Sequence, residues 1–185
     1  MKEMEVSAKS VNIPLRLAII GLGGIGRIYT RAIAARDDLK VVAACDVFAK
    51  ARAEYAREFS SIPLYTTVSE MLKQAEFDAA FVLTSDPCHA EPFIQCLEAD
   101  KHVFVEKPVG NTVAEIKTMV AAMDRHANRV SASGHILRYY PVNYKIKQMA
   151  LAGGPDSGRG RCYLARRLQR VFRVALTSTV SGICL

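Results

Sequence analysis

The chain has 185 residues and a mass of 20.3 kDa, which is room for one domain of ordinary size and part of another. Half of its residues are apolar and 23% are charged, a composition that excludes a disordered or fibrous protein. No apolar run approaches the roughly 20 residues of a membrane-spanning helix, so no membrane partner is expected.

The formal net charge of +7 is concentrated in one part of the chain. Residues 151–185 hold six arginines and a single acid, Asp156, whereas residues 1–150 are nearly balanced. Because no recognised nucleic-acid fold or aromatic platform accompanies these arginines, no nucleic-acid partner is expected. Residues 151–185 also contain no lysine, which marks a break in composition.

The five cysteines are odd in number and form no C-x-x-C pair, so neither a disulfide framework nor a metal site is predicted. Cys45 stands in an apolar run and is expected to be a small buried hydrophobic residue rather than a nucleophile. The first fourteen residues lack the apolar segment of a secretory signal. Together these features favour a cytoplasmic protein.

Short β-rich runs alternate with longer amphipathic segments between Leu15 and Gly134, the pattern of a parallel sheet covered by helices. Strands are predicted over residues 15–20, 40–45, 64–66, 78–84, 102–105 and 129–133. Helices are predicted over residues 24–36, 48–59, 69–74 and 92–99. Another helix is predicted after an N-cap at Asn111 or Thr112, where Glu115 completes a capping box. Six parallel strands with right-handed crossovers predict an α/β fold with a doubly wound parallel sheet of the Rossmann, dinucleotide-binding type.

The same pattern divides the chain into four parts. A flexible arm is expected over residues 1–13, and the dinucleotide-binding domain over residues 14–135. A connecting segment toward a second domain follows at residues 136–152, with a helix from about Pro141. Residues 153–185 are expected to be a truncated or aberrant remnant of that second domain, either a tail read out of frame or a genuine short variant.

Residues 21–26 (GLGGIG) match G-x-G-x-x-G, directly after a predicted strand and at the start of a predicted helix. Gly21 allows a tight turn, Gly23 lets a pyrophosphate approach the backbone, and Gly26 brings the helix close to the strand. The helix N-terminus adds N–H groups that suit an anion, so Gly24 and Ile25 complete the expected cofactor contacts. A glycine-rich turn that serves packing alone is the alternative.

The predicted first helix, which this turn opens, should pack one apolar side on the sheet. That inner side is expected to carry Ile25, Ile28, Ala32 and Ile33.

Asp46 ends the second predicted strand, 20 residues after Gly26, where the fingerprint places a carboxylate that binds the adenosine ribose. A carboxylate there repels a 2′-phosphate, so NAD is the expected cofactor. Lys50 and Arg52 are close enough in sequence to keep NADP as an alternative. Asp46 is also placed to act as the N-cap of the following helix.

Two further segments follow predicted strands at their carboxyl ends, where open α/β sheets bind ligands. In residues 84–91 (TSDPCHAE), His89 is placed either to contact the nicotinamide or to cap the next helix, and capping is the simpler role. In residues 106–108 (EKP), Lys107 is held between an acid and a proline where the reactive end of a dinucleotide is expected. A solvated surface lysine is the alternative.

Four motifs in this order resemble the Gfo/Idh/MocA oxidoreductases, which include glucose–fructose oxidoreductase and inositol dehydrogenase. They are residues 21–26, Asp46 after VVAAC, residues 84–91, and residues 101–108 (KHVFVEKP). The last is close to the family's GKHVxxEKP signature, with Asp100 in place of the usual glycine. Residues 134–139 (GHILRY) resemble the family's entry into its second domain, and the resemblance covers about residues 13–152.

The resemblance implies roles for particular residues. Lys107 is the expected catalytic residue, reaching both the nicotinamide and the substrate hydroxyl, and an amine there is suited to shuttle the proton released when an alcohol becomes a ketone. Glu106 is expected to position Lys107. The residues expected beside the cofactor are Thr84, Pro87, His89, Glu106, Lys107 and Arg138.

The expected function is that of an NAD(P)-dependent oxidoreductase, which transfers hydride between nicotinamide and a hydroxyl of a small-molecule sugar, polyol or related compound. Full-length relatives are expected to be homo-oligomers. Because the groups that hold the substrate would belong mainly to the second domain, slow turnover is expected of the short chain. The alternative is a non-catalytic nucleotide-binding fragment or a regulatory module.

Overall fold

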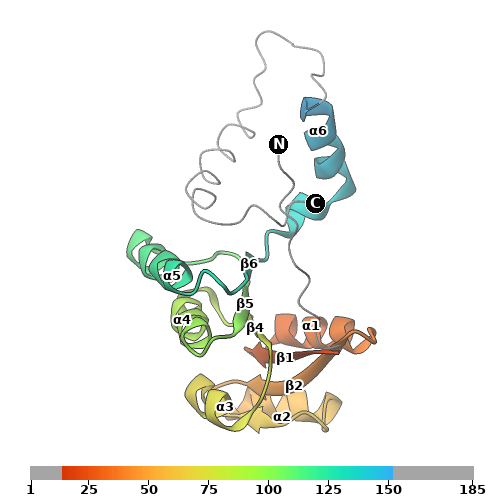
Figure 1. Cartoon of the computed structure of the whole chain (residues 1–185). Coiled ribbons are helices and arrows are strands. Elements are labelled where there is room, and N and C mark those ends of the chain that lie inside the picture. The colour runs from red at the N-terminus through yellow and green to blue at the C-terminus, as the bar shows by residue number, and fades with distance from the viewer. Residues whose placement is uncertain (1–13, 152–185) are drawn as a thin grey trace. The chain divides into compact units, whose positions relative to one another are not determined.

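The computed structural model describes residues 14–151 (Figure 1). The expected arm at residues 1–13 and the expected remnant at residues 153–185 therefore lie outside the described residues. The described part falls into two compact units, one ending at Gly134 and the other beginning at His135. None of the described helices is both long and apolar enough to cross a membrane.

The first unit is built on one six-stranded sheet. Its strands are β1 (Leu15–Ile20), β2 (Leu39–Cys45), β3 (Leu64–Tyr65), β4 (Ala79–Val82), β5 (His102–Val105) and β6 (Ser131–Ser133). The strands lie in the order β3-β2-β1-β4-β5-β6, and every neighbouring pair is parallel. This is the predicted doubly wound α/β fold, with the strand order reversing between β1 and β4.

Five α-helices connect the strands of this unit: α1 (Gly24–Ala34), α2 (Ala49–Glu58), α3 (Val68–Gln74), α4 (Ala90–Glu98) and α5 (Val113–Arg125). The N-cap of α5 is Thr112, one of the two predicted positions. Its hydroxyl accepts a hydrogen bond from the Glu115 N–H, and the Glu115 carboxylate accepts one from the Thr112 N–H, each at 3.1 Å, so the predicted capping box is confirmed.

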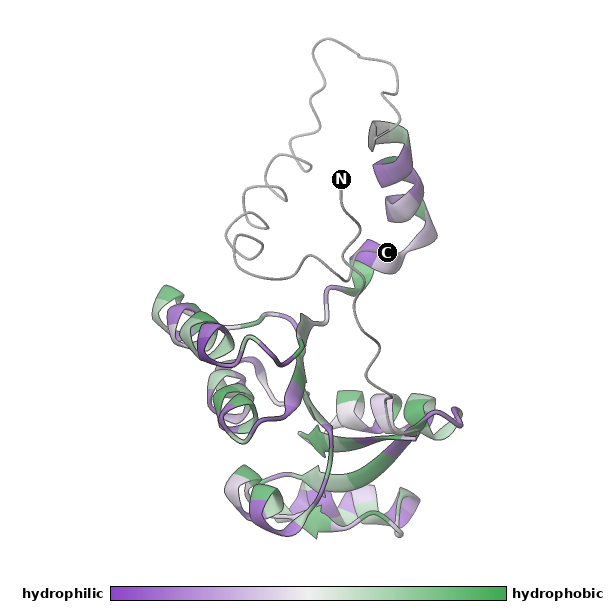
Figure 2. Ribbon diagram, in the orientation of Figure 1, coloured by the Kyte–Doolittle hydropathy of each residue, from purple (hydrophilic) through white to green (hydrophobic). Residues whose placement is uncertain are grey.

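Two hydrophobic cores lie on the two faces of the sheet, because side chains alternate along each strand. In β1, Leu17 and Ile19 face a core shared with Ile33 of α1 and Tyr55 of α2. The intervening residues face the other core, with side chains from α3, α4 and α5 that include Met71, Phe93 and Met119. Figure 2 shows the strands mostly in the hydrophobic colour, whereas the helices carry both colours. Cys45 is buried in the second core, as expected, and burial raises the pKa of its thiol to about 12.

The inner side of α1 differs from the sequence prediction. Ile25 and Ile28 are 47% and 55% exposed, and Ala32 is exposed as well. The buried residues are Gly26, Thr30 and Ile33, so only Ile33 was placed correctly. The prediction followed hydrophobicity, whereas α1 turns a glycine and a threonine to the sheet. Thr30 is tolerated there because its hydroxyl bonds the Gly26 carbonyl and the Tyr55 hydroxyl, each at 2.8 Å.

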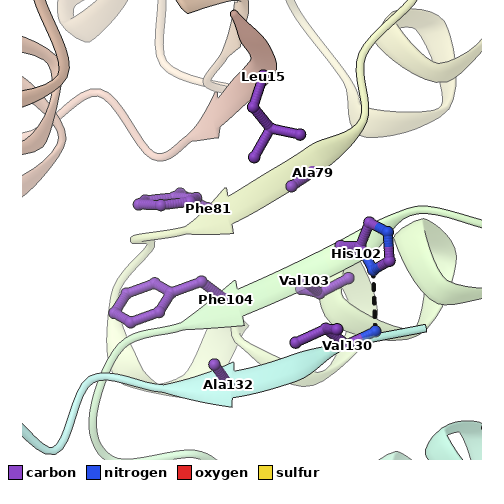
Figure 3. A pocket seen from close by; sticks show the side chains of 8 residues that line it. All are labelled: Leu15, Ala79, Phe81, His102, Val103, Phe104, Val130 and Ala132. Carbon is purple, nitrogen blue, oxygen red and sulfur yellow. Dashed lines mark hydrogen bonds between the residues drawn. The ribbon is translucent and has the colours of Figure 1, made fainter. Parts of the chain in front are cut away.

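On the α1 side, the part of the sheet formed by β4, β5 and β6 carries an open apolar hollow of about 400 Å³ (Figure 3). Its lining residues are Leu15, Ala79, Phe81, His102, Val103, Phe104, Val130 and Ala132. Phe81 and Phe104 lie side by side at one end, with ring centroids 4.9 Å apart. At the other end, Nδ1 of His102 accepts a hydrogen bond from the Val130 N–H at 2.9 Å.

The second unit is helical in its described part. A 3₁₀ turn, η2 (Ile136–Tyr139), leads into α6 (Pro141–Leu151). The side-chain amide of Asn143 donates a hydrogen bond to the Leu137 carbonyl at 2.7 Å, which ties the turn to the first turn of the helix. A helix was predicted here up to residue 152, and that last residue lies outside the described part.

Candidate functional site

The glycine turn after β1 is shaped by close backbone packing. Gly21 has a φ of +98°, and a Cβ added to it would lie 2.6 Å from the Leu83 carbonyl group. A side chain is therefore excluded by both conformation and space. Gly26 packs directly against the Gly21 carbonyl oxygen, which draws the first turn of α1 onto the end of β1. A Cβ on Gly23, in contrast, would have no atom within 4 Å.

The N-terminus of α1 is left open to a ligand. Gly23 is its N-cap and supplies no capping side chain, and the first turn contains no acidic residue. Gly23, Gly24 and Ile25 are all exposed. The first N–H groups of a helix have no partner within the helix and carry the positive end of its dipole. Open space above Gly23 and unmet N–H groups together fit the pyrophosphate of a dinucleotide.

Asp46 follows β2 directly beside this turn. Its Oδ2 accepts a hydrogen bond from the Leu22 N–H at 2.9 Å, and its Oδ1 accepts one from the Phe48 N–H at 2.8 Å. The carboxylate is thus held in place by the glycine turn itself and keeps acceptor sites for a diol. The N-cap of α2 is Phe48, so the prediction that Asp46 caps this helix is wrong by two positions.

Lys50 and Arg52 left NADP open in the sequence. Lys50 is exposed, whereas Arg52 points toward main-chain oxygens. One of its guanidinium nitrogens donates to the carbonyls of Asp46 and Val47, at 2.6 Å and 3.1 Å. These bonds hold the loop between β2 and α2 together. A guanidinium used in this way is less available for a 2′-phosphate.

His89 lies in the loop after β4 and is only 1% exposed. It occupies the N-cap position of α4, but its side chain makes no capping bond, so the predicted capping role is wrong. Its Nε2 lies 2.9 Å from the Thr84 carbonyl oxygen and its Nδ1 lies 2.7 Å from the Pro108 carbonyl oxygen. The ring therefore joins the loop after β4 to the loop after β5. Its contact with a cofactor stays a prediction.

The loop after β5 presents an exposed Lys107. The carboxylate of Glu106 accepts a hydrogen bond from the Lys107 main-chain N–H at 2.8 Å through Oε2. Its other oxygen, Oε1, accepts one from the Tyr29 hydroxyl, also at 2.8 Å. Glu106 thus contacts the main chain of Lys107. The resemblance implied that Glu106 positions this lysine, and that role stays a prediction.

Two residues of this arrangement were missed by the sequence analysis, namely Tyr29 and Gly134. Tyr29 stands on the sheet-facing side of α1, four residues before Ile33, and that spacing was the available signal. Gly134 follows β6, and a Cβ there would lie 2.7 Å from Oε2 of Glu106. No sequence signal connects either residue with Glu106, because the contacts cross between separate elements.

The sheet brings most of the predicted residues to one edge. In the register of the strands, Ile20 lies beside both Cys45 and Val82, and Val82 lies beside Val105. Gly21, Asp46, Thr84 and Glu106 therefore follow four neighbouring strands at their carboxyl ends, around the point where the strand order reverses. Arg138 belongs to η2 in the second unit, so its place beside the cofactor stays a prediction.

An uncapped helix after a glycine turn, with a carboxylate at the end of the second strand, defines a dinucleotide-binding domain of the Rossmann class. Residues 15–133 match the Gfo/Idh/MocA family, described as an oxidoreductase family with an NAD-binding Rossmann fold. The match covers more than half of the chain, and the chain belongs to this family.

Inositol dehydrogenases are among the similar proteins. Myo-inositol 2-dehydrogenase of Thermotoga maritima is 32% identical over 140 residues, which are 76% of this chain and 41% of that protein. Inositol 2-dehydrogenase of Salmonella typhimurium is 28% identical over 142 residues, 75% of this chain and 42% of that protein. The chain thus spans about two fifths of the length of these relatives.

Solved structures of inositol dehydrogenases are also similar to this chain. Myo-inositol 2-dehydrogenase of Lactobacillus plantarum has a TM-score of 0.69 at 32% identity, over 76% of this chain and 42% of that one. Scyllo-inositol dehydrogenase of Lactobacillus casei, solved with bound NAD(H) and scyllo-inositol, has a TM-score of 0.70 at 27% identity, over 75% of this chain and 41% of that one.

Proposed function

We propose that this chain binds NAD and serves hydride transfer between the nicotinamide and a hydroxyl group of an inositol or sugar. The observation that carries the proposal is the exposed, uncapped N-terminus of α1, with Asp46 bonded to the glycine turn beside it. The two features offer N–H donors for a pyrophosphate and a carboxylate for the diol of an adenosine ribose, two groups that NAD presents.

The preference for NAD over NADP rests on charge. Asp46 places a negative charge where a 2′-phosphate would add two more, and the nearby Arg52 is engaged with main-chain carbonyls. Because Nη1 of Arg52 is engaged with the loop, we expect the repulsion of the phosphate by Asp46 to outweigh the attraction of Arg52 and of the exposed Lys50.

Lys107 is the residue proposed to handle the proton. The bound nicotinamide supplies the hydride chemistry. Lys107 stands exposed at the carboxyl end of β5, where its amine can accept the hydroxyl proton while Glu106 holds its main chain. Thr84 and Pro87, in the neighbouring loop tied to this one by His89, are proposed to flank the cofactor.

Titration of the chain with NADH, followed by fluorescence, tests the binding proposal. Gly23→Val should reduce the affinity by at least about 100-fold, because the new side chain fills the space meant for the pyrophosphate. The fold should be unchanged, since a Cβ at this position meets no atom within 4 Å. Ala114→Val, which adds the same side-chain type at the exposed start of α5, should bind NADH normally. Equal affinity of Gly23→Val and the unmodified chain would contradict the assignment of the glycine turn.

The catalytic proposal is tested by NADH production from inositols and sugars. Lys107→Ala should still bind NADH, within about tenfold of the unmodified chain, and lose about 10²- to 10⁴-fold in turnover, the usual contribution of general acid–base catalysis. Turnover that survives in Lys107→Ala would overturn the role of Lys107. Binding of NADH by the unmodified chain, with no turnover of any inositol or sugar, would favour the alternative of a cofactor-binding module.

A further inference from the structure

The carboxylate of Glu106 is held by two hydrogen bonds and confined by a glycine, and these three residues come from separate segments of the chain. The Tyr29 hydroxyl on α1 donates to Oε1, and the Lys107 N–H of the following loop donates to Oε2, each at 2.8 Å. Gly134 follows β6 directly. A Cβ at this position would lie 2.7 to 3.0 Å from the three carboxylate atoms of Glu106, so only glycine leaves the carboxylate enough room. Any side chain at position 134 would displace the carboxylate.

The ring of Tyr29 is itself held in place. It packs against Phe81 and Phe104, with ring centroids 5.7 and 5.6 Å away, at one end of the apolar hollow. Packing of this kind fixes the direction in which the hydroxyl points. Burial, with the hydrogen bond to Glu106, raises the pKa of Tyr29 to about 12, so the phenol remains a donor at physiological pH.

We propose that Tyr29 is a positioning residue for Lys107: by fixing the Glu106 carboxylate it sets the main chain of Lys107, and with it the reach of the lysine amine toward the nicotinamide half of NAD. The proposal rests on the proposed function. It also means that one helix, α1, serves both ends of the dinucleotide. Its N-terminus offers N–H groups to the pyrophosphate, and its second turn supports the loop that carries Lys107.

The role of Tyr29 can be separated from core packing by comparing two ligands. NADH and ADP-ribose share the adenosine, both riboses and the pyrophosphate, and only NADH carries nicotinamide. Tyr29→Phe keeps the ring against Phe81 and Phe104 and removes only the hydroxyl. We expect it to weaken NADH binding by about fivefold, because a displaced Lys107 amine would lose about one hydrogen bond to the nicotinamide half of NADH. Its affinity for ADP-ribose should stay within twofold of that of the unmodified chain.

Tyr55→Phe is the matched control. Tyr55 is a buried tyrosine of the same unit, and its hydroxyl is paired with Thr30 at 2.8 Å instead of with Glu106. Loss of this hydroxyl should leave the ratio of the NADH and ADP-ribose affinities unchanged. A Tyr29→Phe variant that binds both ligands less tightly by the same factor, or neither less tightly, overturns the proposal while the proposed function stands. Failure of the unmodified chain to bind either ligand overturns both.

A second measurement tests the contact without any ligand. Ultraviolet absorbance reports the ionisation of tyrosines as the pH rises. Burial and the Glu106 carboxylate together raise the pKa of Tyr29 to about 12. Glu106→Gln removes the carboxylate charge, so Tyr29 should ionise at a lower pH in the variant than in the unmodified chain. When Glu106→Gln is introduced into the Tyr29→Phe variant, the titration should not change. Identical titrations of Glu106→Gln and the unmodified chain would show that Tyr29 does not meet Glu106, and the proposal would fall.

Discussion

Asp46 shows how a single side chain links the fold to the proposed chemistry. Its carboxylate bonds two main-chain N–H groups, those of Leu22 in the glycine turn and Phe48 before α2. The residue therefore shapes the loop in the absence of any ligand, and a ribose diol would bind to a carboxylate already in place. Preorganisation of this kind reduces the entropy lost on binding.

Asp46→Asn should weaken NADH binding by about 1–3 kcal/mol, the cost of replacing hydrogen bonds to a charged group. The amide keeps one acceptor oxygen, but its NH₂ group would face one of the two N–H donors that Asp46 now accepts from. The discrimination against NADPH should fall at the same time. Calorimetric titration with both dinucleotides measures the two effects.

Asp37→Asn is the control for this prediction, because Asp37 is an exposed carboxylate at the opposite end of β2. It should bind both dinucleotides as the unmodified chain does. Tighter binding of NADPH than of NADH by the unmodified chain would show that Asp46 does not bind the hydroxyl groups of the adenosine ribose.

Asp100 is a departure from the family pattern that the structure explains. It stands where the related signature has glycine, and its φ is +62°, a left-handed conformation that glycine adopts most easily. Aspartate is one of the few other residues that enter this region readily. Its carboxylate is also paired with the guanidinium of Arg129, so the substitution brings a compensating contact.

At the scale of elements, β5 and its neighbours carry both structural and proposed catalytic groups. Val105 ends the strand beside Val82, and the next two residues are Glu106 and Lys107. At the start of the strand, His102 accepts the hydrogen bond from the Val130 N–H that extends the pairing with β6. Burial and the nearby Arg129 lower the pKa of His102, against the opposing influence of Asp100 and Asp78.

This lowered pKa predicts a stability that depends on pH. Above about pH 6.5 the imidazole is neutral in the folded and unfolded chains, and its contribution is fully present. As the pH falls below that value, the unfolded chain takes up the proton first, so the free energy of unfolding decreases until the folded pKa is passed. His102→Asn keeps an acceptor for the Val130 N–H and does not titrate.

The free energy of unfolding of His102→Asn should therefore fall less between pH 7 and pH 5 than that of the unmodified chain. Urea unfolding followed by circular dichroism at the two pH values measures this difference. The other histidines are common to both proteins and cancel in the comparison. An equal decrease in the free energy of unfolding of the two proteins would show that the pKa of His102 is not lowered in the folded chain.

At the scale of the whole molecule, the alternation of apolar runs and amphipathic segments was enough to predict six parallel strands. Glycine spacing and the position of Asp46 were enough to predict a dinucleotide-binding edge. Both signals are local in the sequence. In a doubly wound sheet every loop that follows a strand lies at the carboxyl ends of the strands, so the order of strands and helices along the chain predicts which loops lie near one another.

The inner side of α1 and the links between loops were not predicted. Thr30 is buried because its hydroxyl finds partners on α1 and α2, and His89 is buried between two carbonyls from different loops. Satisfaction of a buried polar group depends on contacts between distant residues, which hydrophobic periodicity does not record. The bond between Tyr29 and Glu106, 77 residues apart, is of the same kind.

A crystal structure of the chain with NADH bound would test the proposed cofactor site at the carboxyl ends of the strands. We expect the pyrophosphate at the main chain of Gly23 and Gly24, the adenosine ribose on the Asp46 carboxylate, and the nicotinamide within reach of the Lys107 amine. A dinucleotide bound away from the glycine turn, or bound there with its ribose turned away from Asp46, would contradict the proposed site.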